Sequence, residues 1–169
     1  MTRIPVRIAF LALVFAVPGM ALAQAGIDWT RYSDPELQFS IDLPLGMFEP
    51  VAGGAAGSLT LAEVGGSGQL SIYGGPAAGL TRDEFERRLS AGEQIRSITY
   101  RTGGNSWFVL SGYYGAEGEE DDPLIFYTKV LMSPDHDSFA AFEISYDEDD
   151  KALFDPIIER IEDSFTRPR

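Results

Sequence analysis

Cysteine is absent from this chain of 169 residues, and histidine occurs once. Without cysteine the protein forms no disulfide and carries no lipid on an N-terminal thiol. Protein sites for zinc and copper are built mainly from cysteine and histidine, so these metals lack their usual ligands here. We therefore expect no cofactor, no metal site and a fold that is held together by its hydrophobic core alone.

Long apolar runs are absent as well, because no segment reaches the roughly 20 uninterrupted apolar residues of a membrane-spanning helix. The run Ile8–Val17 follows Arg3 and Arg7 and leads into Ala21-Leu22-Ala23. A basic start, a short apolar stretch and a small-residue cleavage site are typical of a secretory signal peptide. We therefore expect a periplasmic or secreted protein that does not insert into the membrane after signal removal. The expected organisation is a signal peptide over 1–23, a flexible leader over 24–28 and a single domain over 29–169.

Basic residues are scarce: 13 lysines and arginines stand against 26 aspartates and glutamates, which gives a formal charge of −13. Removal of the signal peptide takes away Arg3 and Arg7 but no acid, so the exported chain is more acidic still. A field of this sign repels nucleic acid and anionic lipid surfaces. The charge therefore argues against nucleic-acid binding and favours cationic partners.

Alternating apolar and polar residues predict a protein rich in strands. In Gln38–Leu43, for example, Phe39, Ile41 and Leu43 recur with the period of two that buries one face of a strand. Short connections join successive runs, which favours antiparallel pairing in a single layer. The predicted strands are Trp29–Tyr32, Gln38–Leu43, Ser58–Glu63, Gln69–Tyr73, Ile95–Thr102, Ser106–Tyr114, Leu124–Ser133 and Phe139–Tyr146, with Gly103-Gly104-Asn105 as a tight turn.

Two helices are expected among these strands. Thr81 and Glu84 form a capping-box pattern before a helix over Arg82–Ala91, whose apolar stripe consists of Phe85 and Leu89. The second helix is expected to open at Asp155-Pro156, with Asp155 as its N-cap and proline at its first position. Its stripe comprises Ile157, Ile158, Ile161 and Phe165.

The runs Trp107–Leu110 and Leu124–Tyr127 are apolar almost throughout, which indicates strands covered on both faces. A helix is therefore expected on each side of the sheet. The predicted fold class is α+β, a mainly antiparallel sheet sandwiched by helices.

A family resemblance extends over nearly all of the chain after the signal. The segments that carry it are Tyr32–Pro44, Leu70–Gly74, Trp107–Gly112, Ile125–Lys129, Phe154–Ile158 and Ser164-Phe165. They resemble small exported bacterial proteins of uncharacterised function, which are similar in turn to proteins of the Mog1/PsbP-like fold. The resemblance implies an antiparallel sheet between helices and a role in binding other proteins or tuning an assembly, and it brings no catalytic motif. The acidic stretch Glu117–Asp122 departs from the shorter, glycine-containing turn expected there.

Tyrosines and acidic residues are the candidate contacts for a partner. Tyrosines left on the outer face of a strand can anchor a protein partner, since large amphipathic rings dominate binding hot spots. The candidate binding residues are Tyr113, Tyr114, Glu119, Glu120, Asp121 and Asp122.

No catalytic or metal-binding residue is assigned. His136 lies between Asp135 and Asp137, but no nucleophile motif accompanies it, so we interpret it as an exposed turn residue. The acidic stretches Glu117–Asp122 and Asp147–Asp150 lack the ligand spacing of a calcium loop, which predicts weak or no cation binding.

The sequence thus favours an exported, non-catalytic binding or accessory module whose partner is another protein of the cell envelope. Two alternatives stay open. An envelope hydrolase with paired carboxylates requires a deep cleft lined by both acids. A carrier of a small ligand requires an enclosed apolar pocket between sheet and helix. The sequence indicates no oligomeric state.

Overall fold

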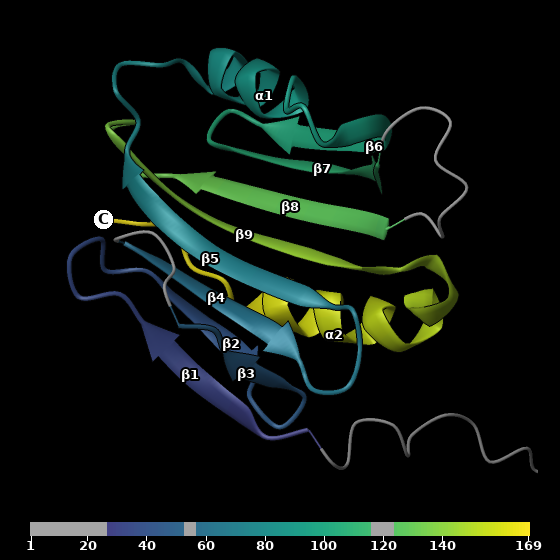
Figure 1. The fold of residues 1–169 in the computed structure, drawn as a ribbon. Coiled ribbons are helices and arrows are strands. Elements are labelled where there is room, and N and C mark those ends of the chain that lie inside the picture. Colours follow the sequence, from purple (N-terminus) through teal and green to yellow (C-terminus); the bar gives the residue numbers. More distant parts are fainter. Residues whose placement is uncertain (1–26, 53–56, 116–123) are drawn as a thin grey trace, which may run out of the picture.

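A seven-stranded antiparallel sheet in the order β3-β4-β5-β9-β8-β7-β6 dominates the computed structural model, which describes residues 27–52, 57–115 and 124–169 (Figure 1). A separate two-stranded sheet consists of β1 and β2. The strands are β1 (Trp29–Ser33), β2 (Ser40–Pro44), β3 (Phe48–Pro50), β4 (Ser58–Glu63), β5 (Gln69–Pro76), β6 (Ile95–Gly104), β7 (Trp107–Tyr114), β8 (Leu124–Met132) and β9 (Ser138–Asp147). The helices are α1 (Arg82–Ser90), the 3₁₀ turn η1 (Glu148–Asp150) and α2 (Lys151–Ser164).

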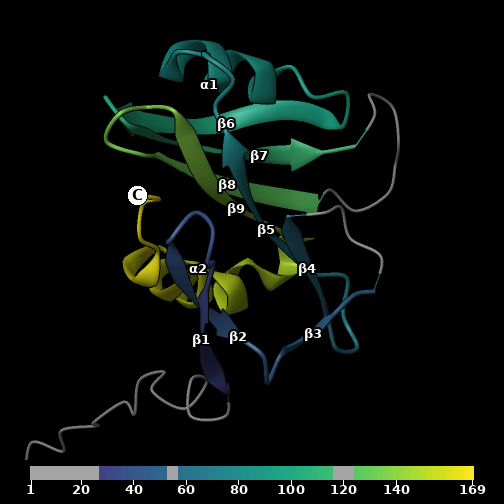
Figure 2. The same ribbon diagram turned by 90° about the vertical axis from the view of Figure 1, so that its left-hand side faces the viewer.

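The two helices cover opposite faces of the large sheet, and strands β7, β8 and β9 run between them (Figure 2). Successive residues of a strand point to opposite faces. On β9, Ala141 therefore belongs to the small core beneath α1, whereas Phe142 belongs to the much larger core beneath α2. This arrangement confirms the predicted α+β fold with a helix on each side of the sheet.

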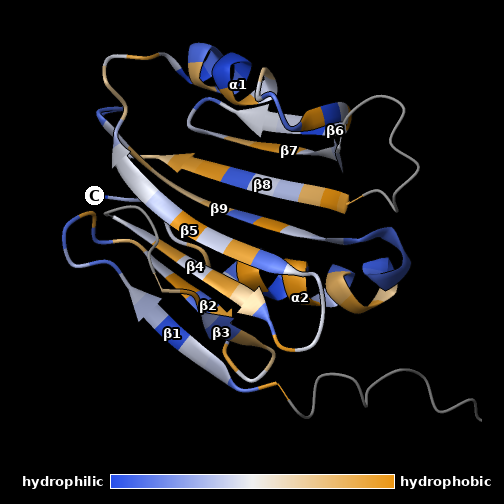
Figure 3. Ribbon diagram, in the orientation of Figure 1, coloured by the Kyte–Doolittle hydropathy of each residue, from blue (hydrophilic) through white to orange (hydrophobic). Residues whose placement is uncertain are grey.

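Helix α1 covers its face only thinly. Phe85 and Leu89, the predicted stripe, pack against the small core but remain half-buried. Most of the helix is hydrophilic, as the blue of its ribbon indicates (Figure 3). Because this helix is short and has only two apolar residues on the sheet, space remains beside each of its ends. The candidate site lies in the space beside its C-terminal end.

The expectation of a single layer of strands is wrong for the first hairpin, because β1 and β2 pair only with each other. Their buried residues Phe39, Ile41 and Leu43 pack into the core beneath α2. Hydrogen bonds hold the hairpin there, since the Asp42 backbone amide donates to the Ser164 side-chain hydroxyl at 2.8 Å. The hairpin therefore helps α2 to cover the sheet instead of extending its edge.

The sheet also contains details that the sequence did not indicate. The short edge strand β3 was not predicted, and its Phe48 is completely buried. Gly103 and Gly104, expected in a turn, are the last residues of β6. Ile27, expected in the flexible leader, packs against the large core, and the Asp28 carbonyl accepts a hydrogen bond from the Gly46 amide.

Helix α2 begins at Lys151, so the predicted start at Asp155-Pro156 is wrong and Pro156 lies inside the helix. The extra turn buries Phe154, whose ring stacks on Tyr146 with centroids 4.3 Å apart. Complete burial of such a ring contributes about 2–3 kcal/mol, enough to offset much of the cost of a proline here. The carbonyl left without a donor is that of the exposed Ala152, where water can serve as a partner.

The other expectations for α2 are confirmed. Ile157, Ile158, Ile161 and Phe165 are all at most 7 % exposed. Among the described residues, no helix combines the length and apolar character that crossing a bilayer requires.

Candidate functional site

The first turn of α1 is fixed by the predicted capping box. The Glu84 amide donates to the Thr81 hydroxyl at 3.3 Å, and the Thr81 amide donates to the Glu84 carboxylate at 2.9 Å. These hydrogen bonds satisfy two backbone donors that the helix itself leaves free. The same contacts hold the pKa of Glu84 below its usual value.

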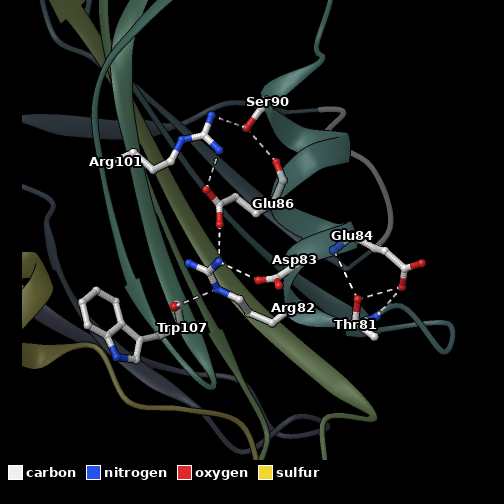
Figure 4. A network of polar contacts seen from close by, with 8 residues as sticks. All are labelled: Thr81, Arg82, Asp83, Glu84, Glu86, Ser90, Arg101 and Trp107. Carbon is white, nitrogen blue, oxygen red and sulfur yellow. Dashed lines mark hydrogen bonds and ion pairs between the residues drawn. The ribbon is translucent and has the colours of Figure 1, made fainter.

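A buried carboxylate holds the middle of α1 against the sheet. Glu86 is only 5 % exposed and lies between Arg82, one turn earlier, and Arg101 of β6 (Figure 4). Arg101 donates to Glu86 at 2.8 Å, and the Arg82 guanidinium also lies over the Phe108 ring. The network accounts for a buried acid in a helix that otherwise contacts the sheet through two apolar side chains. A Cβ at Gly103 would overlap the Arg82 guanidinium and lie 2.9 Å from the Trp107 carbonyl oxygen, so a larger residue there would displace Arg82 and crowd β7.

A row of three residues crosses the sheet beneath the C-terminal end of α1. Leu110 of β7 faces Thr128 of β8, and Thr128 faces Glu143 of β9. The Thr128 hydroxyl donates to one oxygen of Glu143 at 2.9 Å, and the Tyr114 hydroxyl donates to the other at 2.5 Å. Two hydroxyl groups therefore fix the orientation of one half-buried carboxylate.

A cavity of about 140 Å³ opens above this carboxylate. Its floor is the sheet, and its walls come from the end of α1 and the segment that follows. The lining residues are Arg88, Leu89, Gly92, Gln94, Ile95, Leu110, Tyr114, Phe126, Thr128 and Glu143. The cavity combines apolar walls with a single acid, and it is smaller than the roughly 300–1,000 Å³ of ordinary ligand pockets.

Burial and the nearby Glu143 charge raise the pKa of the Tyr114 hydroxyl. Burial and the same charge also raise the pKa of Tyr73. A raised pKa keeps each phenol protonated, so Tyr114 stays a hydrogen-bond donor to the carboxylate. The ring of Tyr114 stacks on Phe126 with centroids 4.5 Å apart, which holds the hydroxyl in place.

The two candidate tyrosines do not form a common surface. They are consecutive residues of β7, so Tyr113 points to the α2 face and Tyr114 to the α1 face, and both are half-buried. The Tyr113 hydroxyl donates to Glu148 at 2.7 Å beside a second hollow of about 270 Å³. Tyr113 and Tyr114 therefore cannot contact a partner on the same face, because neighbouring strand residues face opposite ways, and their role in binding stays a prediction.

The candidate acids Glu119, Glu120, Asp121 and Asp122 lie outside the described residues. Of the second acidic stretch, Glu148–Asp150 form the 3₁₀ turn before α2, where negative charge is favoured by the helix dipole. Across the described ranges, no three acids or histidines are placed to hold a metal ion.

His136 occupies a turn, as expected, with a left-handed φ of 66°. It is half-buried, whereas we expected it to be exposed, and it lies in a groove of about 520 Å³ beside the first turn of α1. Hydrogen bonds from the Ser133 hydroxyl and the Asp137 amide lower the pKa of the neighbouring Asp135. A lowered pKa is the opposite of what a general acid requires.

Sequence reasoning missed Glu143 and Thr128. Their contact depends on pairing between β8 and β9, and Tyr114 reaches Glu143 across the strand that separates β7 from β9. The available signal is a glutamate within the apolar run Phe139–Tyr146, where a charge needs a partner.

No protein-family model and no curated protein matches this chain. Solved structures do match its fold. The Ran-binding protein Mog1p of Saccharomyces cerevisiae is similar with a TM-score of 0.61 and 6 % identity, over 83 % of this chain and 95 % of that one. A mutant of protein Mog1 gives the same TM-score and identity, over 83 % of this chain and 96 % of that one.

Cyanobacterial PsbP (CyanoP) from Synechocystis is similar with a TM-score of 0.59 and 14 % identity, over 89 % of this chain and 98 % of that one. The chain therefore has the Mog1/PsbP-like fold, as its sequence resemblance implied. At these identities the likeness describes the fold alone.

Proposed function

We propose that this chain is a non-catalytic binding or accessory module whose partner is another protein. The observation that carries the proposal is the cavity beside α1, where Tyr114 and Thr128 hold Glu143 in a fixed orientation. A site of about 140 Å³ accepts one side chain of a partner, while a ligand of ordinary size does not fit. Mog1p is described as a Ran-binding protein, so the fold also serves protein binding elsewhere.

The hydrolase alternative receives less support from the site. Paired-carboxylate hydrolysis needs two acids that flank the bond to be broken, whereas Glu143 is the single acid among the described residues that line the cavity. In the groove beside His136, hydrogen bonds from the Ser133 hydroxyl and the Asp137 amide lower the pKa of Asp135, which makes it a poor general acid. In the cavity beside α1, the volume of about 140 Å³ limits a carried ligand to a few atoms.

We also propose that the protein works in the periplasm or is secreted. The support is the N-terminal pattern of Arg3 and Arg7, the apolar run Ile8–Val17 and the exit at Ala23. Expression of the full chain in a Gram-negative host, followed by fractionation and N-terminal sequencing, tests this. We expect a periplasmic product that begins at Gln24, and a cytoplasmic product that retains Arg3 contradicts the proposal.

Site-specific crosslinking tests the binding function. A photoreactive residue is placed at Arg87, exposed on α1, and in a matched variant at Glu159, exposed on α2. In the envelope of the producing cell, we expect a discrete protein adduct from position 87 and none from position 159. Absence of adducts from both positions, or turnover of envelope polymers by the purified protein, contradicts a non-catalytic binding module.

A further inference from the structure

Among the described residues, Glu143 forms no ion pair, unlike the shielded carboxylates Glu86 and Glu162. Glu86 pairs with two arginines, and Glu162 pairs with Lys129 at 2.8 Å. Within residues 27–52, 57–115 and 124–169, Glu143 accepts hydrogen bonds from the Tyr114 and Thr128 hydroxyls, and no lysine or arginine forms an ion pair with it. Each carboxylate oxygen keeps further acceptor capacity. The cavity therefore contains an oriented negative charge that is free to take a donor.

The surroundings of Glu143 favour a positively charged ligand. Leu89 and Gly92 bring the C-terminal end of α1 to the cavity, where the helix dipole is negative. The Tyr114 and Phe126 rings line the same space, and aromatic faces attract cations. The net charge of −13 adds a long-range attraction of the same sign.

The shape of the cavity selects a slender cation with an apolar stem. Leu89, Ile95 and Leu110 are apolar lining residues against which methylene groups can pack. The fork of a guanidinium binds best to two free carboxylate oxygens. On Glu143 both oxygens already accept a hydroxyl, so a compact ammonium group fits the remaining positions better.

We propose that the cavity beside α1 binds the ammonium group of a lysine side chain of the partner protein, with Glu143 as its counter-ion. This inference rests on the proposed binding function and names the chemistry of that site. The lysine stem packs against the apolar walls, and its ammonium donates to Glu143.

Arg88 is the competing cation. It lines the cavity from α1, is exposed, and forms no ion pair among the described residues. Its charge repels an incoming ammonium group at the rim. Replacing it by glutamine is therefore expected to strengthen lysine binding, which is a result that a purely structural role of the cavity does not produce.

The test is an NMR titration of the full exported chain with Nα-acetyl-lysine methylamide, and with the norleucine analogue, which lacks only the ammonium. We expect saturable shifts at Leu110, Phe126 and Thr128 with the lysine compound, and binding weaker by about tenfold with norleucine. The E143Q variant should lose affinity by about tenfold, and R88Q should gain about twofold or more at low salt. The arginine analogue should bind more weakly than the lysine compound.

Equal binding of the norleucine compound overturns the proposal and needs no variant, so it holds even if E143Q is poorly folded. Tighter binding of the arginine analogue, or no saturable shift with the lysine compound, overturns it as well. The crosslinking experiment separates this inference from the binding function. If position 87 still captures its partner in an E143Q background as in the wild type, the lysine contact is wrong while the binding function stands.

Discussion

The Tyr114 hydroxyl donates to the Glu143 carboxylate at 2.5 Å, and this hydrogen bond joins β7 to β9 across the intervening strand β8. Its length is typical of a hydroxyl bound to a charged carboxylate. The contact orients the acid in the cavity beside α1 and also ties together three strands of the sheet. The same hydrogen bond therefore contributes to the site and to stability.

Removal of this hydroxyl should cost stability. The Y114F variant keeps the ring that stacks on Phe126 but leaves one Glu143 oxygen without its donor. We expect a loss of about 2 kcal/mol in the free energy of unfolding, measured by urea denaturation. The matched control is Y113F, because the Tyr113 hydroxyl meets Glu148 at an exposed position and should cost under about 1 kcal/mol. Equal losses in both variants contradict this account of Tyr114.

The attachment of α1 should depend on Glu86. The E86Q variant removes the charge between Arg82 and Arg101 and should destabilise the fold by about 2 kcal/mol, since one partner of a buried pair is lost. Asp83 contacts the same Arg82 but its side chain is 83 % exposed. The D83N control should therefore cost under about 1 kcal/mol. Thermal or urea unfolding measures both variants, and a D83N loss as large as that of E86Q rejects the burial argument.

Substitution by alanine should have different effects on stability at two glycines of the sheet. A Cβ at Gly112 would collide with the Ser97 carbonyl and lie 2.8 Å from the Ile98 Cα, so β6 must shift. We expect G112A to lose about 2 kcal/mol, as crowding of packed backbone does. A Cβ at Gly75 meets nothing within 4 Å, so G75A should be neutral or stabilise by about 0.5 kcal/mol. Equal unfolding midpoints for the two variants refute the close approach of β6 and β7.

Stability should fall in alkaline solution, in part through Tyr146. Burial, with the nearby charge of Asp155, raises the pKa of Tyr146 to about 12. Below about pH 10 the phenol is protonated in both the folded and unfolded chains, and its contribution to stability is fully present. Between about pH 10 and 12 the unfolded chain releases the proton while the folded chain keeps it, so stability falls by up to about 1.4 kcal/mol per pH unit.

The Y146F variant tests this pH dependence because it cannot ionise but keeps the ring that stacks on Phe154. Its free energy of unfolding should fall less steeply than that of the wild type between about pH 10 and 12. A residual slope is expected from Tyr73, Tyr114 and Tyr127, whose pKa values are also raised. If the free energies of unfolding of wild type and Y146F fall with the same slope, Tyr146 has the same pKa in the folded and unfolded chains and the prediction is wrong.

Much of the fold could be predicted because its signals are local. The capping box at Thr81 and Glu84 formed as expected, since the two residues are one helical turn apart. The start of α2 could not be predicted, because its extra turn depends on the stack of Phe154 on Tyr146. The sequence did not indicate which face each tyrosine takes: Tyr114 lines the cavity, while Tyr113 lies on the other face, and their role in binding stays a prediction.

The sequence by itself determined the approximate positions of most strands and of both helices, the excess of acidic residues and the lack of cysteine chemistry, because these follow from composition and short-range periodicity. Only the tertiary structure decided that Leu110, Thr128 and Glu143 share a row, and that α1 ends above them. The physical reason is that strand register and helix docking depend on contacts between residues far apart in the sequence, since whole apolar faces pack together. The position of the Glu143 carboxylate in its cavity results from that packing, so no motif or residue spacing in the sequence indicates it.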